Sequence, residues 1–163
     1  MTSQNKLHLT IIGRSEPIAF VGYDKLVAIP AKIDTGAYRS AVHADNIYVD
    51  DQQQLHFTLF AGHPTCGNCA TEVVTDKFAT TSISNSFGDT EERYEVEFKV
   101  KLGPKVFKES FTLANRVKKI YPILLGRKLL NGRFLIDPAF SGLSRSELKT
   151  KYNITLPDDE EDK

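Results

Sequence analysis

The sequence predicts an all-β protein, and residues 94–102 are the clearest reason. Apolar and charged side chains alternate there, as in a strand with one face on a core and the other in solvent. Other short apolar runs are bounded by glycine, proline, asparagine or aspartate, which are typical turn residues. Few stretches show the helical period. Many short strands joined by turns are therefore expected.

Length and composition indicate one folded domain. The chain has 163 residues, 40% of them hydrophobic, which suffices for one core but not for two. Its 21 basic and 21 acidic side chains cancel, so no global charge attracts nucleic acid or anionic lipid. We expect a single domain over residues 1–143, followed over 144–163 by a short helix and a disordered acidic tail.

The first half of the chain predicts strands and hairpins. A strand over 7–12, ended by Gly13, would bury Leu7, Leu9 and Ile11 on one face. Runs at 17–21 and 25–29 flank a predicted turn at 22–24, and 41–49 is again strand-like. Residues 55–60 and 71–75 predict a hairpin whose long loop carries Cys66 and Cys69.

The second half adds a strand pair and two short helices. Gly103 and Pro104 turn the 94–102 strand so that residues 106–113 can return beside it. Residues 127–131 are compatible with a helix that stops at Gly132, and 134–136 is extended. Ser144 and Glu147 have the spacing of a capping box for a terminal helix, and residues 158–162 are all acidic.

Two motifs stand out for chemistry. Asp34 follows an apolar approach and is followed at once by Thr35, Gly36 and Ala37, small residues that permit a sharp turn. Such a triplet also suits an ordinary turn, in which the aspartate accepts hydrogen bonds from local amides. The second motif is an apolar run that ends in Gly126-Arg127.

Together with residues 40–44 and 132–138, these motifs resemble the retropepsin-like aspartic endopeptidases, in a bacterial branch also labelled "ATP-dependent zinc protease". The resemblance covers roughly residues 10–140 and departs at Tyr38, where a basic residue is expected. It implies the closed barrel of the acid protease fold, with one short helix after Gly126. Members of this family are often associated with glutamate ligases, which makes a glutamylated tail a conceivable substrate.

The resemblance implies an aspartic endopeptidase, a hydrolase that cleaves peptide or protein substrates. That mechanism needs two carboxylates that share a proton. Only one Asp-Thr-Gly is present, so we expect a C2 homodimer that pairs Asp34 with its copy in the partner. Asp34, Thr35 and Gly36 are the expected catalytic residues, and Thr35 would bond across the dimer axis.

The same resemblance suggests supporting and substrate-binding residues. Leu125, Gly126 and Arg127 would support the Asp34 loop, with Arg127 in a structural ion pair. A flap is expected near residues 84–91. The expected substrate contacts are Ala37, Asn85, Ser86, Phe87, Gly88 and Asp89.

Cys66 and Cys69 provide the main rival interpretation. Cys-x-x-Cys is half of a zinc site, and His63 with His56 or His43 could complete it. Because a second paired half is missing, free thiols or a redox-sensitive disulfide fit equally well, and we expect no metal and no cofactor. Two alternative functions therefore stay open, a non-catalytic peptide-binding or dimerisation module and a protein with a Cys66/Cys69 zinc site.

The sequence also sets expectations for location and other partners. The N-terminus lacks the apolar segment of a secretion signal, and no run reaches membrane-spanning length. Basic residues at 116–119 and 127–133 are not interleaved with aromatic residues, which favours a solvated face over nucleic-acid binding. We expect a cytoplasmic protein with no membrane and no nucleic-acid partner.

Overall fold

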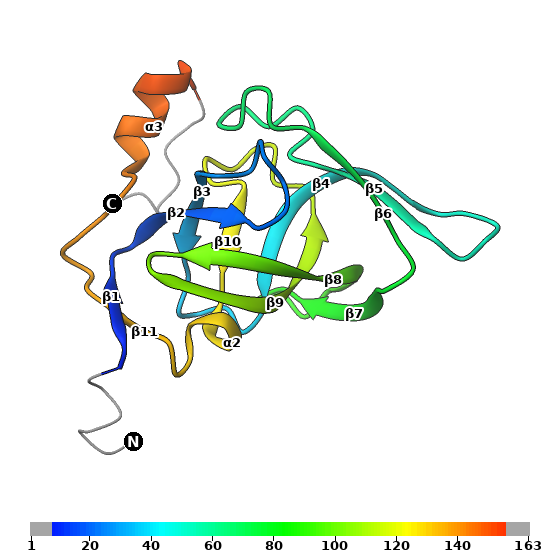
Figure 1. Cartoon of the computed structure of the whole chain (residues 1–163), viewed down its shortest axis with the longest axis horizontal. Helices are drawn as coiled ribbons and strands as arrows, with labels where there is room; N and C mark the ends of the chain where they lie inside the picture. Colours follow the sequence, from blue (N-terminus) through cyan, green and yellow to red (C-terminus); the bar gives the residue numbers. More distant parts are fainter. Residues whose placement is uncertain (1–7, 156–163) are drawn as a thin grey trace.

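The computed structural model describes residues 8–155, which form a mostly β structure with few helices (Figure 1). The expected all-β class is thus confirmed. The strands are β1 (Thr10–Ile12), β2 (Ser15–Phe20), β3 (Ile29–Ile33), β4 (Ser40–Val49), β5 (Leu55–Leu59), β6 (Thr71–Thr75), β7 (Ala79–Ser84), β8 (Thr90–Leu102), β9 (Lys105–Ala114), β10 (Ile123–Leu125) and β11 (Phe134–Ile136). The helices are α2 (Arg127–Leu130) and α3 (Arg145–Tyr152).

Six of these strands form a closed barrel. They pair in the order β10, β3, β2, β8, β9 and β4, and β4 pairs with β10 to close the ring. β10 lies between β3, which runs parallel to it, and β4, which runs antiparallel. The closed barrel that the resemblance implied is therefore present.

The alternating pattern of β8 supplies much of the barrel core. Val96, Phe98, Val100 and Leu102 are buried, whereas the charged residues between them are exposed. Phe98 packs edge-on against Phe20 of β2, with ring centroids 5.2 Å apart. The pattern predicted at the sequence level therefore sets which face of β8 is inside.

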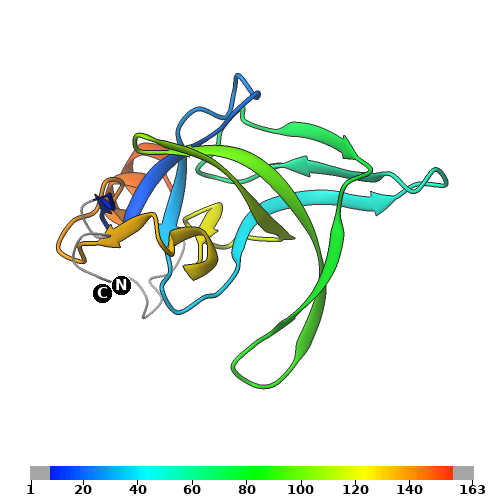
Figure 2. The same cartoon turned by 60° about the horizontal axis from the view of Figure 1, so that its bottom comes forward.

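Beyond the barrel, β5 and β6 extend the sheet next to β4, and β7 pairs with the first half of β8. Figure 2 shows the β7–β8 hairpin extending from the barrel on the same side as the loop between β3 and β4. The predicted hairpin with the cysteine loop is confirmed as β5 and β6.

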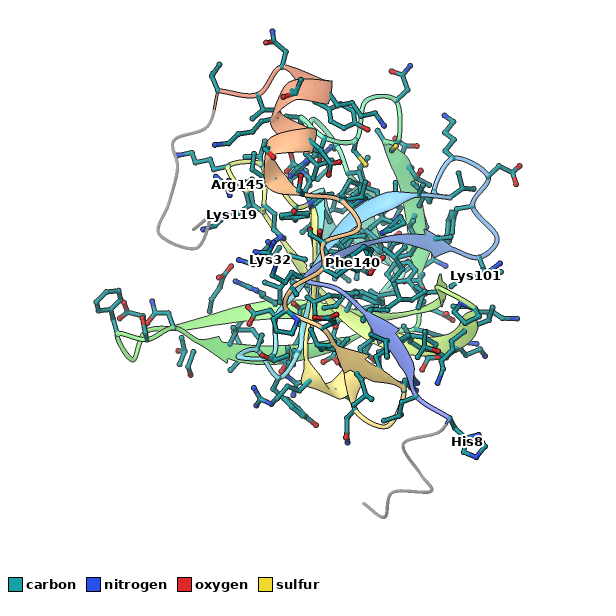
Figure 3. All side chains as sticks on the ribbon, turned by 90° about the vertical axis from the view of Figure 1, so that its left-hand side faces the viewer. His8, Lys32, Lys101, Lys119, Phe140 and Arg145 are labelled. Atoms are coloured by element: carbon teal, nitrogen blue, oxygen red, sulfur yellow. The ribbon has the colours of Figure 1, made fainter. Side chains whose placement is uncertain are left out.

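α3 begins with the predicted capping box: the Ser144 hydroxyl accepts from the Glu147 amide, and the Glu147 carboxylate accepts from the Ser144 amide. Leu148 of this helix packs on Ile120 and Tyr121. Lys32, Lys119 and Arg145 lie toward the side of the molecule that carries α3 (Figure 3). The acidic run at 158–162 lies outside the described residues, and the division at residue 143 stays a prediction.

Two details of the strand predictions are wrong. Ile11, expected to be buried, is 68% exposed, and Ile12 is buried instead. The parallel pairing of β1 with β11 places Ile12 on the inner face of the strand. β3 begins at Ile29 rather than at residue 25. Within residues 8–155, no helix is long and apolar enough to cross a membrane.

Candidate functional site

The loop between β3 and β4 is organised around the half-buried carboxylate of Asp34. Its Oδ1 accepts hydrogen bonds from the amides of Gly36 at 2.9 Å and Ala37 at 3.2 Å. The Asp34 amide itself donates to the carbonyl of Leu125 in β10 at 2.9 Å. Asp34 therefore fills the local turn role that the sequence left open, while Thr35 and Gly36 are exposed to solvent.

The first residues of α2 hold this loop in place through backbone hydrogen bonds. The amides of Arg127 and Lys128 donate to the carbonyls of Ala37 and Tyr38 at 2.8 and 3.0 Å. A Cβ on Gly126 would lie 2.6 Å from the carbonyl oxygen of Arg39 and 2.7 Å from that of Tyr38, so only glycine fits here. Leu125, Gly126 and Arg127 thus lie against the loop, and their support of a functional site stays a prediction.

Residue Ser40 also supports the loop, although sequence reasoning did not identify it as a site residue. Its buried hydroxyl accepts from the Gly126 amide at 3.0 Å. This bond satisfies an amide that would otherwise be buried without a partner. Serine at the start of a strand gives no signal of such a contact, because its partner lies 86 residues away.

Arg127 has a different role from the predicted ion pair. Its Nη1 donates to the backbone carbonyls of Thr35 at 3.1 Å and Gly36 at 2.9 Å. No carboxylate of the described chain pairs with it. Within the described chain, the exposed loop carbonyls bond the guanidinium in place of an acid, and an ion pair with an acid at a dimer interface stays a prediction.

The aromatic ring of Tyr38 lies between two arginines on the rim of the loop. The guanidinium carbons of Arg39 and Arg127 are 5.8 and 5.9 Å from the ring centroid, within the range of cation–π attraction. Arg39 also forms an ion pair with Glu95 of β8, with Nη1 at 3.0 and 3.2 Å from the two carboxylate oxygens. Sequence reasoning missed both the Arg39–Glu95 pair and the two contacts to Tyr38.

The expected flap residues form the turn between β7 and β8. The Asn85 side-chain oxygen accepts from the amides of Phe87 and Asp89, at 2.9 and 3.0 Å, and Gly88 adopts a φ of +84°. Phe87 is 89% exposed at the tip. The hairpin is therefore present where it was expected, and its role in binding substrate stays a prediction.

The loop that carries Cys66 and Cys69 has a different character. His43 and His63 both hold the Arg116 backbone: the Arg116 amide donates to Nδ1 of His43, and Nε2 of His63 donates to the Arg116 carbonyl. The second nitrogen of each ring is also bonded, to the Ala61 carbonyl and to Thr65. Burial first, and then the neighbouring His43, lower the pKa of His63 to about 4.

This arrangement does not support a zinc site. Both cysteines are free, and among residues 8–155 no three histidine, cysteine or acidic side chains come together as metal ligands. Burial and the hydrogen bond to Cys69 raise the pKa of the Cys66 thiol far above its usual value, so it is a poor thiolate ligand. His56 instead bonds Asp50, with 2.7 Å between Nε2 and Oδ2.

Curated proteins that resemble this chain in sequence share one name. One relative, from Desulfotalea psychrophila, is named "Probable alpha-L-glutamate ligase" and is 33% identical over 135 residues, covering 79% of this chain and 28% of the relative. A protein of the same name from Shewanella pealeana is 32% identical over 145 residues, covering 85% and 30%. The chain thus spans less than a third of the length of these curated relatives.

A solved structure supports the fold. The Legionella pneumophila protein Lpg0085, of unknown function, superposes with a TM-score of 0.63 at 28% identity, over 82% of this chain and 96% of that chain.

The names of the curated relatives overturn the expected activity. We expected an aspartic endopeptidase, and hence a hydrolase and protease, whereas the relatives are named as ligases. A shared fold does not carry a shared reaction with it, which is why motifs around Asp34 could predict the barrel correctly and the activity wrongly.

The remaining comparison concerns the family. The matching family model is described as "Retropepsin-like aspartic endopeptidase RimB" and covers residues 11–147, which include the Asp34 loop, α2 and the β7–β8 hairpin. This chain belongs to the RimB-like family.

Proposed function

We propose that this chain acts in α-L-glutamate ligation as the part that binds the acidic, glutamate-bearing polypeptide. The observation that carries this proposal is its similarity, over 79% or more of its length, to relatives named α-L-glutamate ligase. Because the chain matches less than a third of each relative, the proposal assigns it binding of the polypeptide and not the ligation step.

The Asp34 loop is the proposed binding site. In this proposal an extended peptide lies against the exposed residues Thr35 and Gly36. The arginines around Tyr38 supply positive charge at its rim. In this proposal Ala37 contacts the peptide backbone, and the hairpin turn at 85–89 covers the peptide from the same side of the barrel (Figure 2).

A C2 homodimer in the cytoplasm is part of the same proposal. Two exposed Asp34 loops, related by a twofold axis through Thr35, would form one continuous groove from two short ones. The free thiols Cys66 and Cys69 agree with a reducing compartment. Sedimentation velocity should give a dimer for the unmodified chain and a monomer for Thr35→Arg; a monomer in both cases would reject the dimer.

The binding proposal is tested by fluorescence anisotropy with two labelled peptides that differ only in six C-terminal residues, glutamates in one and glutamines in the other. We expect the glutamate peptide to bind at least tenfold more tightly. Equal affinity for the two peptides, or no binding of either, would reject the proposed function.

A further inference from the structure

Two guanidinium groups converge on one exposed aromatic ring beside the Asp34 loop. Arg39 is the last residue of the β3–β4 loop and Arg127 the first of α2, yet the guanidinium carbons of both lie within 6 Å of the Tyr38 ring centroid. Each guanidinium is positively charged and attracts anions, and Arg39 already pairs with the carboxylate of Glu95. Tyr38 itself is 54% exposed, so the cluster can be reached from solvent.

The hydrogen bonds of both arginines leave donors available. Arg39 bonds Glu95 through Nη1, and Arg127 bonds the loop carbonyls through Nη1. Among the described residues, Nη2 and Nε of these two side chains have no hydrogen-bond partner. A guanidinium with two free N–H groups fits a carboxylate in the bidentate geometry that makes such pairs strong.

The arginines are also held in place before any ligand binds. Glu95 is only 14% exposed and fixes Arg39 from β8, while the carbonyls of Thr35 and Gly36 fix Arg127. A preorganised guanidinium loses less side-chain entropy on binding than a mobile lysine does. The cluster thus has the features of a carboxylate subsite rather than of a solvated basic surface.

We propose that Arg39 and Arg127, placed around Tyr38, bind two side-chain carboxylates of one extended acidic peptide. This inference rests on the proposed function and names the residues that give it specificity. Side chains at positions i and i+2 of an extended strand are on the same face, roughly 6.6 Å apart. In this proposal the two arginines bind acidic side chains at positions i and i+2 and not those of adjacent residues.

The first test varies the peptide. Anisotropy compares two peptides that each carry two glutamates and four glutamines, with the glutamates at positions i and i+2 in one and at i and i+3 in the other. The i, i+2 peptide should bind about tenfold more tightly, although both carry the same charge. Equal affinity for the two peptides would show that only total charge matters and would overturn the proposal.

The second test varies the protein. Arg39→Gln should weaken binding of the six-glutamate peptide about tenfold. Lys101→Gln, the same change of charge near the β8–β9 turn, is the matched control and should leave affinity unchanged. Arg39→Lys separates geometry from charge: lysine keeps the positive charge without the planar fork, so most of the affinity should stay lost, and full affinity in this variant would overturn the bidentate subsite.

These outcomes separate the inference from the proposed function. If the unmodified chain prefers glutamate over glutamine peptides but none of the variants changes that preference, the subsite is wrong and the proposed function stands. If Arg39→Gln and Lys101→Gln weaken binding equally, the subsite is also wrong. If the unmodified chain shows no preference for the glutamate peptide over the glutamine peptide, both the subsite and the proposed function are wrong. Circular dichroism of each variant shows whether a loss of binding comes from unfolding.

Discussion

The Asp34 loop and the Cys66 loop are both polar turns that the sequence singled out, but the structure uses them differently. In the Cys66 loop, His63, Thr65 and Cys66 are buried, and the ring nitrogens of His43 and His63 are all bonded within the chain. In the Asp34 loop the backbone is hydrogen-bonded to β10 and α2, while Thr35, Gly36 and Tyr38 face solvent.

The difference separates a structural loop from a binding loop. Buried polar groups whose partners are all internal contribute to stability and specify one conformation. Exposed groups on a rigid support are what a ligand site requires, because the ligand meets donors and acceptors that are already positioned. Substitutions in the Cys66 loop should therefore change stability, and those at the exposed rim of the Asp34 loop should change binding.

The largest expected effect is on the buried support of the Asp34 loop. Gly126→Ala would place a methyl group 2.6 to 2.7 Å from the backbone of Tyr38 and Arg39, which cannot move without displacing the loop. We expect a loss of about 3 kcal/mol in the free energy of unfolding, measured by urea denaturation. Gly36→Ala is the matched control, because its Cβ would meet only the Asp34 side chain, at 3.2 Å. Equal losses in the free energy of unfolding for the two variants would contradict the distinction between the packed Gly126 and the exposed Gly36.

The next effect is a pH dependence that arises in the Cys66 loop. His63 has a pKa of about 4 in the folded chain, against 6.5 when unfolded. The unfolded state therefore binds a proton first, so stability is complete above pH 6.5 and falls as the pH drops toward 4. Up to roughly 3 kcal/mol should be lost across that range.

Urea denaturation at several pH values tests this effect. His63→Gln should flatten the dependence between pH 6.5 and 4, although this variant will be less stable at neutral pH. His8→Gln, at an exposed position, is the matched control and should keep the slope of the unmodified chain. An unchanged slope in His63→Gln would show that the buried ring does not carry the effect.

Local sequence patterns predicted the parts of the fold that depend on near neighbours. The period of two in β8 placed Phe98 inside, and the spacing of Ser144 and Glu147 gave the helix cap. Ile11 and Ile12 show the limit: two adjacent apolar residues fit either face, and the distant strand β11 decides between them.

The candidate site shows even more clearly that local sequence does not predict contacts between distant residues. The Asp34 loop and its Gly126 support were predicted from a resemblance, but the partners of the arginines were not. Arg127 bonds a carbonyl 92 residues away, and Arg39 pairs with a carboxylate 56 residues away. Sequence spacing contains no information about such contacts, because the barrel closure alone brings them together.

A third prediction concerns Ser40, which links the open loop to its buried support. Ser40→Ala would leave the Gly126 amide buried without a partner and should cost about 2 kcal/mol in the free energy of unfolding. Ser86→Ala, in the exposed hairpin turn, should change stability by less than about 0.5 kcal/mol. A small effect at Ser40 would mean that water replaces its hydroxyl.

The smallest expected change in stability is at Asp34 itself. In Asp34→Asn the side-chain oxygen can still accept from the Gly36 and Ala37 amides, so the free energy of unfolding should fall by less than about 1 kcal/mol. Binding of a six-glutamate peptide should become severalfold tighter, because a negative charge beside the acidic ligand is removed. Asp51→Asn, exposed in the β4–β5 turn, makes the same change of charge away from the site and should leave affinity unaltered. If Asp34→Asn abolished binding while the fold persisted, the carboxylate would have to contact the ligand directly, and the loop would be more than a rigid frame for the arginines.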